Sequence, residues 1–215
     1  MHARREATAD RRAPGTEMTP ELHAVSDRFI YEHATLKHIL AIAPSEALGR
    51  PVDGHEWTVG QMLAHLADSL GEYERLIRRW LEGEAPLEGW DPDAMNAATA
   101  SRYADAGVPE IAELFATGIN GLVAALASIP DQQLAEPLGR ADALTTLRFL
   151  GEHCLNHAIP IVDAVPEIRM DPLVLNWLLG ADFEGDAANE WQNRLLRDAR
   201  EYIASLPDED DEEDE

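Results

Sequence analysis

The sequence predicts an all-α protein, built as a four-helix bundle with extra C-terminal helices. Segments in which Val, Ile and Thr alternate with polar residues are scarce, so a sheet is not expected. Apolar residues instead recur at helical spacing in four long segments, which loops rich in Gly and Pro separate. With 215 residues, of which 45% are hydrophobic, the chain can bury one sizeable core.

The first two long helices have clear starting signals. Pro20 suits the first turn of a helix, and the apolar stripe after it predicts a helix to about Ile42. Thr58 can cap the next helix, and Gln61, three residues on, can complete a capping box with it. This second helix is expected to continue to about Leu81.

The other two long helices follow a loop rich in Gly, Pro and Asp. A short helix is expected within residues 94–104, and the third long helix runs from about Val108 to just before Pro130. The fourth is expected over residues 145–157 or beyond. We expect a bend at Pro160, because proline interrupts the backbone hydrogen bonds of a helix.

The two ends of the chain differ from the bundle in composition. The N-terminal segment has paired arginines but no apolar stretch, so it does not match a secretory signal. The last eight residues are all acidic, which favours a solvated tail. Four parts are therefore expected: a disordered segment 1–18, the bundle 19–168, a helical extension 169–206 and a disordered acidic tail 207–215. Within the extension, helices are expected at 172–179 and at about 187–205.

Composition also narrows the classes of partner. The formal net charge is −24, from 17 basic and 41 acidic residues. Such a surface repels phosphate backbones and anionic lipids, so neither nucleic acid nor a membrane is expected as a partner. No stretch approaches the roughly 18 apolar residues of a membrane span. The single cysteine, Cys154, suits a reducing compartment, and a cytoplasmic protein is expected.

Two histidines four residues apart, His153 and His157, point to metal chemistry. Four residues turn a helical side chain by only about 40°, so both imidazoles face one way and can share a metal ion. The pair lies beside the apolar stripe of its helix, on a flank that points into a bundle cleft. Taken alone, this spacing is also that of two unrelated histidines.

A third histidine, His65, occupies a comparable flank of the second long helix. Three imidazoles that converge from two helices would bind zinc, nickel or iron(II) and leave coordination positions open for water or substrate. By itself, His65 also fits a hydrogen-bonded histidine of the core. Four other histidines are expected on the surface or in loops: His23, His33, His38 and His55.

Two common metal motifs are excluded by the residues around these histidines. A zincin requires HExxH, and Cys154 stands where its glutamate would be. The paired Glu-x-x-His motifs of a di-iron bundle do not occur on these helices. Cys154 lies on the apolar stripe and is expected in the core, with a role as a fourth ligand as the alternative. Asp68, one turn after His65, could orient a ligand from outside the coordination sphere, or be a solvated surface charge.

Two segments resemble the signatures of a known family. WTVGQMLAHLADSLGEYERL, residues 57–76, is similar to the signature helix of the DinB-like superfamily, with its tryptophan, helix cap and histidine. HCLNH, residues 153–157, resembles the second signature of that family. Between them lie a Gly/Pro loop, a short helix near Asn96 and a third long helix that ends in SIPDQQL, as in the family pattern. The resemblance covers about residues 19–165.

The resemblance implies an up-down-down-up four-helix bundle, often dimeric, in which His65, His153 and His157 bind one divalent metal ion. Characterised members include transferases that use bacillithiol or mycothiol, and mycothiol-dependent maleylpyruvate isomerases. The isomerase branch commonly has a glutamate where this chain has His153, which weighs against isomerase activity.

The function expected from the sequence is therefore a metal-dependent transferase that joins a low-molecular-weight thiol to an electrophilic substrate. A metal bound by neutral histidines keeps its full charge, so it lowers the pKa of a thiol that binds it. The same ion could activate water, which would make the protein a hydrolase. A third alternative is an ion that only holds two helices together.

Overall fold

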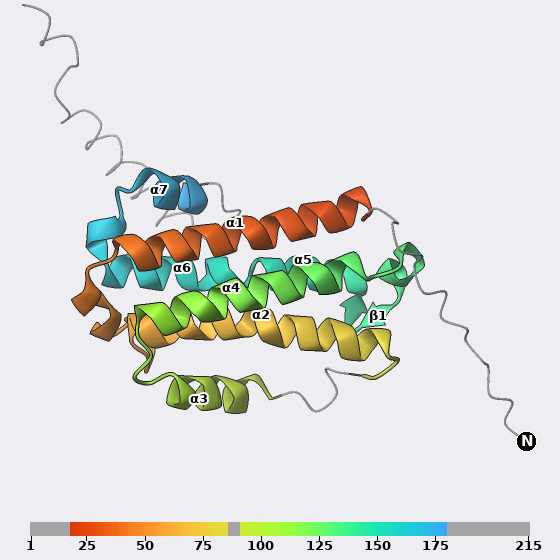
Figure 1. Cartoon of the computed structure of the whole chain (residues 1–215), viewed down its shortest axis with the longest axis horizontal. Helices are drawn as coiled ribbons and strands as arrows, with labels where there is room; N and C mark the ends of the chain where they lie inside the picture. Colours follow the sequence, from red (N-terminus) through yellow and green to blue (C-terminus); the bar gives the residue numbers. More distant parts are fainter. Residues whose placement is uncertain (1–17, 86–90, 180–215) are drawn as a thin grey trace, which may run out of the picture.

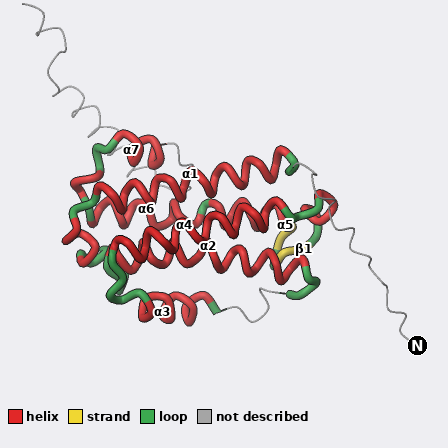
Figure 2. Tube along the Cα trace, viewed as in Figure 1, coloured by secondary structure: helices red, strands yellow, loops and turns green. Residues whose placement is uncertain are grey.

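The computed structural model describes residues 18–85 and 91–179, and helices dominate this part of the chain (Figure 2). The all-α class expected from the sequence is confirmed. Figure 1 shows the bundle helices side by side, with two shorter helices packed outside it. The bundle consists of α1 (Pro20–Ile42), α2 (Val59–Leu81), α4 (Val108–Ala127), α5 (Ala143–Gly151) and α6 (His153–Ala164), and the outer helices are α3 (Pro92–Arg102) and α7 (Pro172–Leu179).

Several expectations concern residues outside the described ranges. They are the disordered state of residues 1–17, the helix at about 187–205 and the disordered tail 207–215. These expectations, the domain boundaries and the up-down-down-up order of the helices stay predictions.

The predicted helix starts are confirmed at the level of single hydrogen bonds. Thr19 caps α1, since its hydroxyl oxygen accepts from the Leu22 N–H at 3.2 Å. At the start of α2, the Gln61 N–H donates to Thr58 Oγ1 and the Thr58 N–H donates to Gln61 Oε1, at 3.3 and 2.9 Å. This capping box fixes the first turn of α2, one turn before His65.

The most extensive contact between two elements joins α2 and α4. The two backbones approach closely at Gly118 of α4. A Cβ atom at this position would lie 2.8 Å from Leu70 Cβ and 3.2 Å from the Ala67 carbonyl oxygen. Because glycine has no Cβ, this contact can form without displacing α2.

Helix α4 corrects the expectation that no segment approaches a membrane span. By length and composition alone, Val108–Ala127 is apolar enough to cross a membrane, a test that the core helix of a globular protein also passes. Within the bundle, the side chains of Ile111, Phe115 and Leu122 are 0% exposed. The helix packs on both α1 and α2, so its apolar face forms part of the core.

The fourth predicted helix is divided at a position that the sequence did not indicate, and the bend expected at Pro160 stays a prediction. The interruption falls at Glu152, between α5 and α6, whereas α6 continues past Pro160 to Ala164. The Glu152 N–H still donates back to the Phe149 carbonyl, and the Leu155 N–H then donates to the Glu152 carbonyl over a tighter three-residue turn. Gly151 precedes the interruption, and glycine has a low helix propensity.

Two further features were not predicted. Residues Pro137–Leu138 (β1) and Ala141–Asp142 (β2) form a minimal antiparallel hairpin, in the register Pro137↔Asp142 and Leu138↔Ala141. Its turn contains Gly139, with φ of +80°, a conformation that glycine adopts freely. Short 3₁₀ helices occupy three of the connections: Ser45–Gly49 (η1), Asp131–Ala135 (η2) and Pro166–Ile168 (η3).

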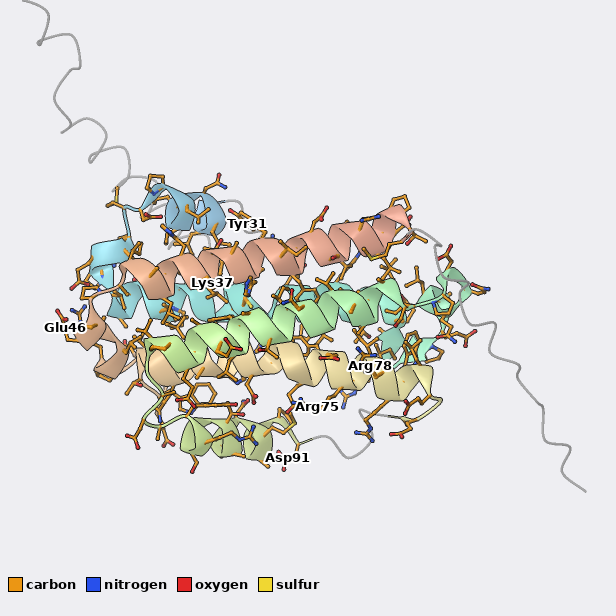
Figure 3. The ribbon with its side chains drawn as sticks, viewed as in Figure 1. Tyr31, Lys37, Glu46, Arg75, Arg78 and Asp91 are labelled. Carbon is orange, nitrogen blue, oxygen red and sulfur yellow. The ribbon has the colours of Figure 1, made fainter. Side chains whose placement is uncertain are left out.

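Helix α7, which begins at Pro172 as predicted, docks on α1 through polar contacts. The indole N–H of Trp177 donates to Glu32 Oε2 over 2.9 Å, and each of these two residues is 1% exposed. Arg28 Nε lies 2.6 Å from the other oxygen of this carboxylate. Nearer the surface, Asn176 Nδ2 donates to the hydroxyl of Tyr31, which is labelled beside α7 in Figure 3. A buried carboxylate therefore anchors the extra helix to the bundle.

The first prediction concerns the buried side chain of Glu32. Burial raises its pKa from 4.5 to about 7, an effect that the nearby Arg28 charge only partly opposes. Because the folded state holds this proton more tightly than the unfolded state, stability falls as pH rises from 4.5 to 7 and then levels off. A shift of this size corresponds to about 3 kcal/mol.

Replacing Glu32 with Gln should remove this dependence, since the amide does not titrate. The difference in unfolding free energy between Glu32→Gln and the wild type should therefore change by roughly 3 kcal/mol in favour of the variant between pH 4.5 and pH 8. Denaturant titration at both pH values measures it. Glu82→Gln, at an exposed position, is the matched control. A difference that stays constant with pH would show that Glu32 does not titrate in this interval.

Candidate metal centre

The structure brings together three histidines from two helices. His65 on α2 faces His153 and His157 on α6. The Nε2 atom of His153 lies 3.4 Å from that of His65 and 3.3 Å from that of His157. One ligand atom from each ring falls within 4.8 Å of the others, a group that could hold a metal ion. The sequence predicted this convergence.

Local structure explains why the rings meet. The Thr58–Gln61 capping box sets the register of α2, and it turns His65 inward, where the residue is 8% exposed. The interruption at Glu152 places His153 at the start of α6 and His157 one turn later on the same face. Helices α2 and α6 are in direct contact, so the histidines meet across this interface.

The spacing of the nitrogens fits a bound metal ion. A tetrahedral zinc ion holds imidazole nitrogens at about 2.0–2.1 Å, which places two such nitrogens about 3.3 Å from each other. The Nε2 atom of His153 lies 3.4 and 3.3 Å from those of His65 and His157, and both distances agree with this value. Three protein ligands of this type leave a further coordination position open.

The electrostatics of the cluster favour neutral histidine, the protonation state that binds metal ions. The pKa of each of His65, His153 and His157 is lowered from 6.5 to about 4. Burial is the main cause, and the neighbouring imidazoles add to it because two charged rings would repel each other. All three rings are therefore neutral at pH 7, which keeps their nitrogen lone pairs available for a cation.

Tyr73, which the sequence placed only in the apolar stripe of α2, is part of the site. Its hydroxyl oxygen lies 2.8 Å from Nδ1 of His153, and burial raises the pKa of its phenol above the usual value. When Nε2 of His153 is the ligand atom, its Nδ1 carries the proton and donates to the Tyr73 oxygen. This bond fixes the orientation of the ring. Nδ1 of His157 is also buried, without a hydrogen-bond partner among the described residues.

The loop before α2 covers one side of the cluster. An isolated bridge between Pro51 and Thr58 closes this loop, and Gly54 within it has a φ of +74°. The ring of Trp57 lies 4.9 Å from that of His65, measured between centroids. His55 is exposed, as expected, yet its ring lies 5.9 Å from that of His157. The sequence did not indicate that this loop borders the site.

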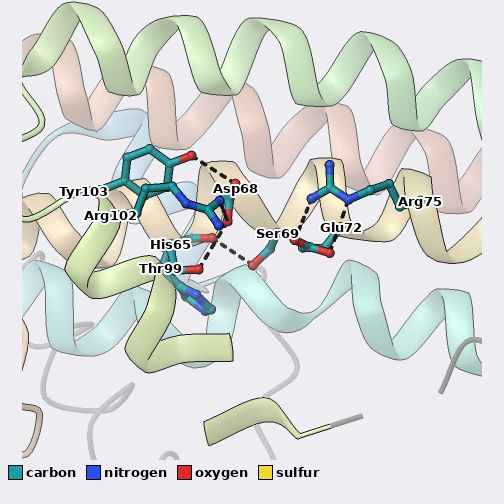
Figure 4. Close-up of polar contacts among 8 residues, drawn as sticks. All are labelled: His65, Asp68, Ser69, Glu72, Arg75, Thr99, Arg102 and Tyr103. Atoms are coloured by element: carbon teal, nitrogen blue, oxygen red, sulfur yellow. Dashed lines mark hydrogen bonds and ion pairs between the residues drawn. The ribbon is translucent and has the colours of Figure 1, made fainter. Parts of the chain in front are cut away.

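The carboxylate of Asp68 is directed toward residues of α3 and its C-terminal end (Figure 4). Its carboxylate accepts hydrogen bonds from Thr99 Oγ1 and from the Tyr103 hydroxyl, each at 3.2 Å, and Arg102 lies 3.7 Å away. These contacts tie α3 to α2. The expected role of Asp68 in orienting a metal ligand stays a prediction.

The other residues that the sequence analysis singled out are not part of the cluster. Cys154 is 5% exposed, and its thiol has a raised pKa because it is buried in the apolar core. It does not belong to the group of converging ligand atoms. His38 is near the surface and lies 2.9 Å from Asp171. His33 was expected at the surface, but it is partly buried against Phe115, and burial lowers its pKa to about 4.

The second prediction concerns the protonation of the cluster. In metal-free protein, the ring C–H resonances of His65, His153 and His157 should titrate together near pH 4 rather than near 6.5. Proton NMR between pH 8 and pH 3.5 would show it, with His65→Gln used to assign one ring. A normal titration near 6.5 for all three would mean that the rings are open to solvent and do not form a closed cluster.

Family comparison agrees with the site. The model of the DinB superfamily matches residues 29–159, which is more than half of the chain and includes all three histidines. Neither the curated proteins nor the solved structures contain a match to this sequence. The matched range and the three-histidine geometry lead to one conclusion: the chain belongs to the DinB superfamily.

Proposed function

We propose that this DinB-superfamily protein binds one divalent metal ion through His65, His153 and His157 and is a transferase that uses a low-molecular-weight thiol. The observation that carries the proposal is the convergence of three neutral imidazoles, with Nε2 separations of 3.3 and 3.4 Å. Zinc, nickel and iron(II) all suit such a ligand set.

The surroundings of the cluster support an ion that meets a substrate. His153 and His157 are partly exposed, so the cluster reaches the surface of the bundle. A site with three protein ligands and an accessible fourth position is typical of catalytic metals, whereas purely structural zinc sites use four protein ligands. This comparison favours an enzyme over an ion that only joins α2 to α6.

A thiol suits this cluster better than water does. No aspartate or glutamate among the described residues belongs to the group of converging ligand atoms, so this group itself contains no carboxylate that could serve as the general base of a hydrolase. A free thiol has a pKa near 8.5, far below that of water, so a modest shift produces a thiolate at neutral pH. When bound, the metal ion would supply this shift and thus a nucleophilic sulfur.

The residues of the chain would then serve the thiol in distinct ways. Tyr73 holds the His153 ring through Nδ1. Trp57 covers the His65 ring and limits the access of water from that side. The apolar core behind the cluster keeps the three imidazoles neutral.

Metal binding is the third prediction. Elemental analysis of the purified protein should give about one divalent ion per chain, and competition with a coloured chelator should give its affinity. Loss of a residue that only hydrogen-bonds to a metal ligand lowers metal affinity roughly 10–100-fold. His65→Ala should lower the affinity by more than this, because it removes a ligand itself. Full occupancy in the His65→Ala variant would exclude His65 from the site.

A matched pair of tyrosine variants tests the orienting bond in the same assay. Tyr73→Phe removes the partner of His153 Nδ1 and should weaken metal binding about 10–100-fold. Tyr103→Phe also removes a buried hydroxyl, but one that bonds to Asp68, so the affinity should stay within about threefold of the wild type. Equal losses in both variants would indicate a general effect on stability.

The fourth prediction separates the transferase from its alternatives. Cobalt(II)-substituted protein should develop a sulfur-to-cobalt charge-transfer band when 2-mercaptoethanol is added. Chelation should abolish thiol transfer to a generic electrophile, yet leave most of the helical circular dichroism, because the apolar core stabilises the bundle by itself. Unfolding on chelation without any response to thiol would support a structural ion. A response to acetate but not to thiols would support a hydrolase.

A further inference from the structure

A groove lies beside the metal centre, between α3 and the loop that precedes α2. Its volume is about 470 Å³, enough for a small molecule. One wall is the stretch Glu56–Trp57 with Gln61, and the other is a stripe along α3 that begins at Asp93 and Asn96. Farther along this stripe only small side chains line the groove, namely Ala97, Ala100, Ser101 and Ala104. We call this feature the α3 groove.

The two walls of the α3 groove are held at a fixed separation. Gln61 caps α2 with its side-chain oxygen, and its Nε2 donates to the Ala100 carbonyl of α3 at 3.3 Å. Farther along α2, Asp68 accepts hydrogen bonds from Thr99 of α3 and from Tyr103 at its C-terminal end (Figure 4). These bonds give α3 a defined position although it lies outside the bundle.

The charges that line the α3 groove have one sign. Glu56 on one wall and Asp93 on the other are exposed, and neither forms a hydrogen bond or ion pair with any described residue. No Lys or Arg is among the lining residues. The remaining polar groups of the lining, such as Asn96, are neutral. The groove therefore favours a cation and disfavours a carboxylate or phosphate.

Trp57 connects the α3 groove with the metal centre. Its side chain lines the groove, and its ring packs against His65. Gln61 in the groove wall and His65 are four residues apart on α2, so they lie on one face at neighbouring turns. An aromatic face in the same lining as two carboxylates is also a good environment for an ammonium group. Trp57 therefore belongs both to the lining of the groove and to the surroundings of the histidines.

We propose that the α3 groove binds the ammonium group of the thiol cosubstrate, so that the preferred thiols are aminothiols. This inference rests on the proposed thiol-dependent function and specifies its substrate class. The sulfur is directed to the three-histidine cluster, while Glu56, Asp93 and the face of Trp57 hold the positive charge.

The test compares cysteamine with N-acetylcysteamine, which has the same thiol arm but lacks the positive charge. Each is titrated into cobalt(II)-substituted protein, and the charge-transfer band gives its dissociation constant. The two thiols differ in acidity, so the deciding quantity is the affinity for cysteamine divided by the affinity for N-acetylcysteamine. This ratio is compared between the wild type and the variant Glu56→Gln/Asp93→Asn. This ratio should fall about three- to tenfold in the double variant, and it should also fall with added salt.

The control is Asp27→Asn/Glu136→Gln, which removes the same total charge from exposed positions on α1 and before β1. Its affinity ratio should stay within about twofold of the wild type, since distant surface charges are screened. An equal ratio in the wild type and the groove variant, with both thiols binding, would overturn the groove inference and leave the proposed function intact. The absence of a band with every thiol would overturn the proposed function, and the inference with it.

Discussion

The register of helix α2 is the constraint on which the rest of the structure depends. Its first turn is fixed by the mutual hydrogen bonds of Thr58 and Gln61. From this start, His65 and Tyr73 are directed toward α6, and Asp68 is directed toward α3. A helix of this kind positions side chains by rotation of about 100° per residue, so a slip of one residue would move all of these groups off their partners.

Helix α2 also has the most extensive contact in the bundle, with α4, and the absence of a side chain at Gly118 permits that contact. The candidate metal ligand His65 therefore stands on a helix that packing against α4 supports. Packed helices resist small displacements, because interiors are as dense as organic crystals. This rigidity keeps the imidazoles near the spacing that a metal ion requires.

The sequence predicted what depends on local pattern, and it missed what depends on contacts between distant segments. The starts of α1 and α2 follow from Pro20 and Thr58, and the three histidines follow from their positions on helix faces. The sequence predicted a bend at Pro160, but it did not indicate the division between α5 and α6 at Glu152, since proline is the stronger local signal.

Contacts at long sequence separation explain the other omissions. Tyr73 joins His153 from 80 residues away, and its spacing on α2 is that of an ordinary core aromatic. Trp177 reaches Glu32 from 145 residues away. Glu32 lies in phase with Phe29 and Leu36 on the apolar stripe of α1, which indicates burial but does not identify its partner. Such pairs are set by the packing of the bundle, and a single helical wheel does not contain that information.

The large negative charge of the chain gives the groove and the metal centre a common physical context. A net charge of −24 creates a field that concentrates cations near the surface and repels anions, although salt screens it beyond about 8–10 Å. Both a divalent ion and an ammonium-bearing thiol are attracted by such a field. The field alone does not select between cations, because it acts on any positive charge in the same way. Selection requires groups at fixed positions, and we propose that these are the three imidazoles for the ion and the two carboxylates of the α3 groove for the ammonium group.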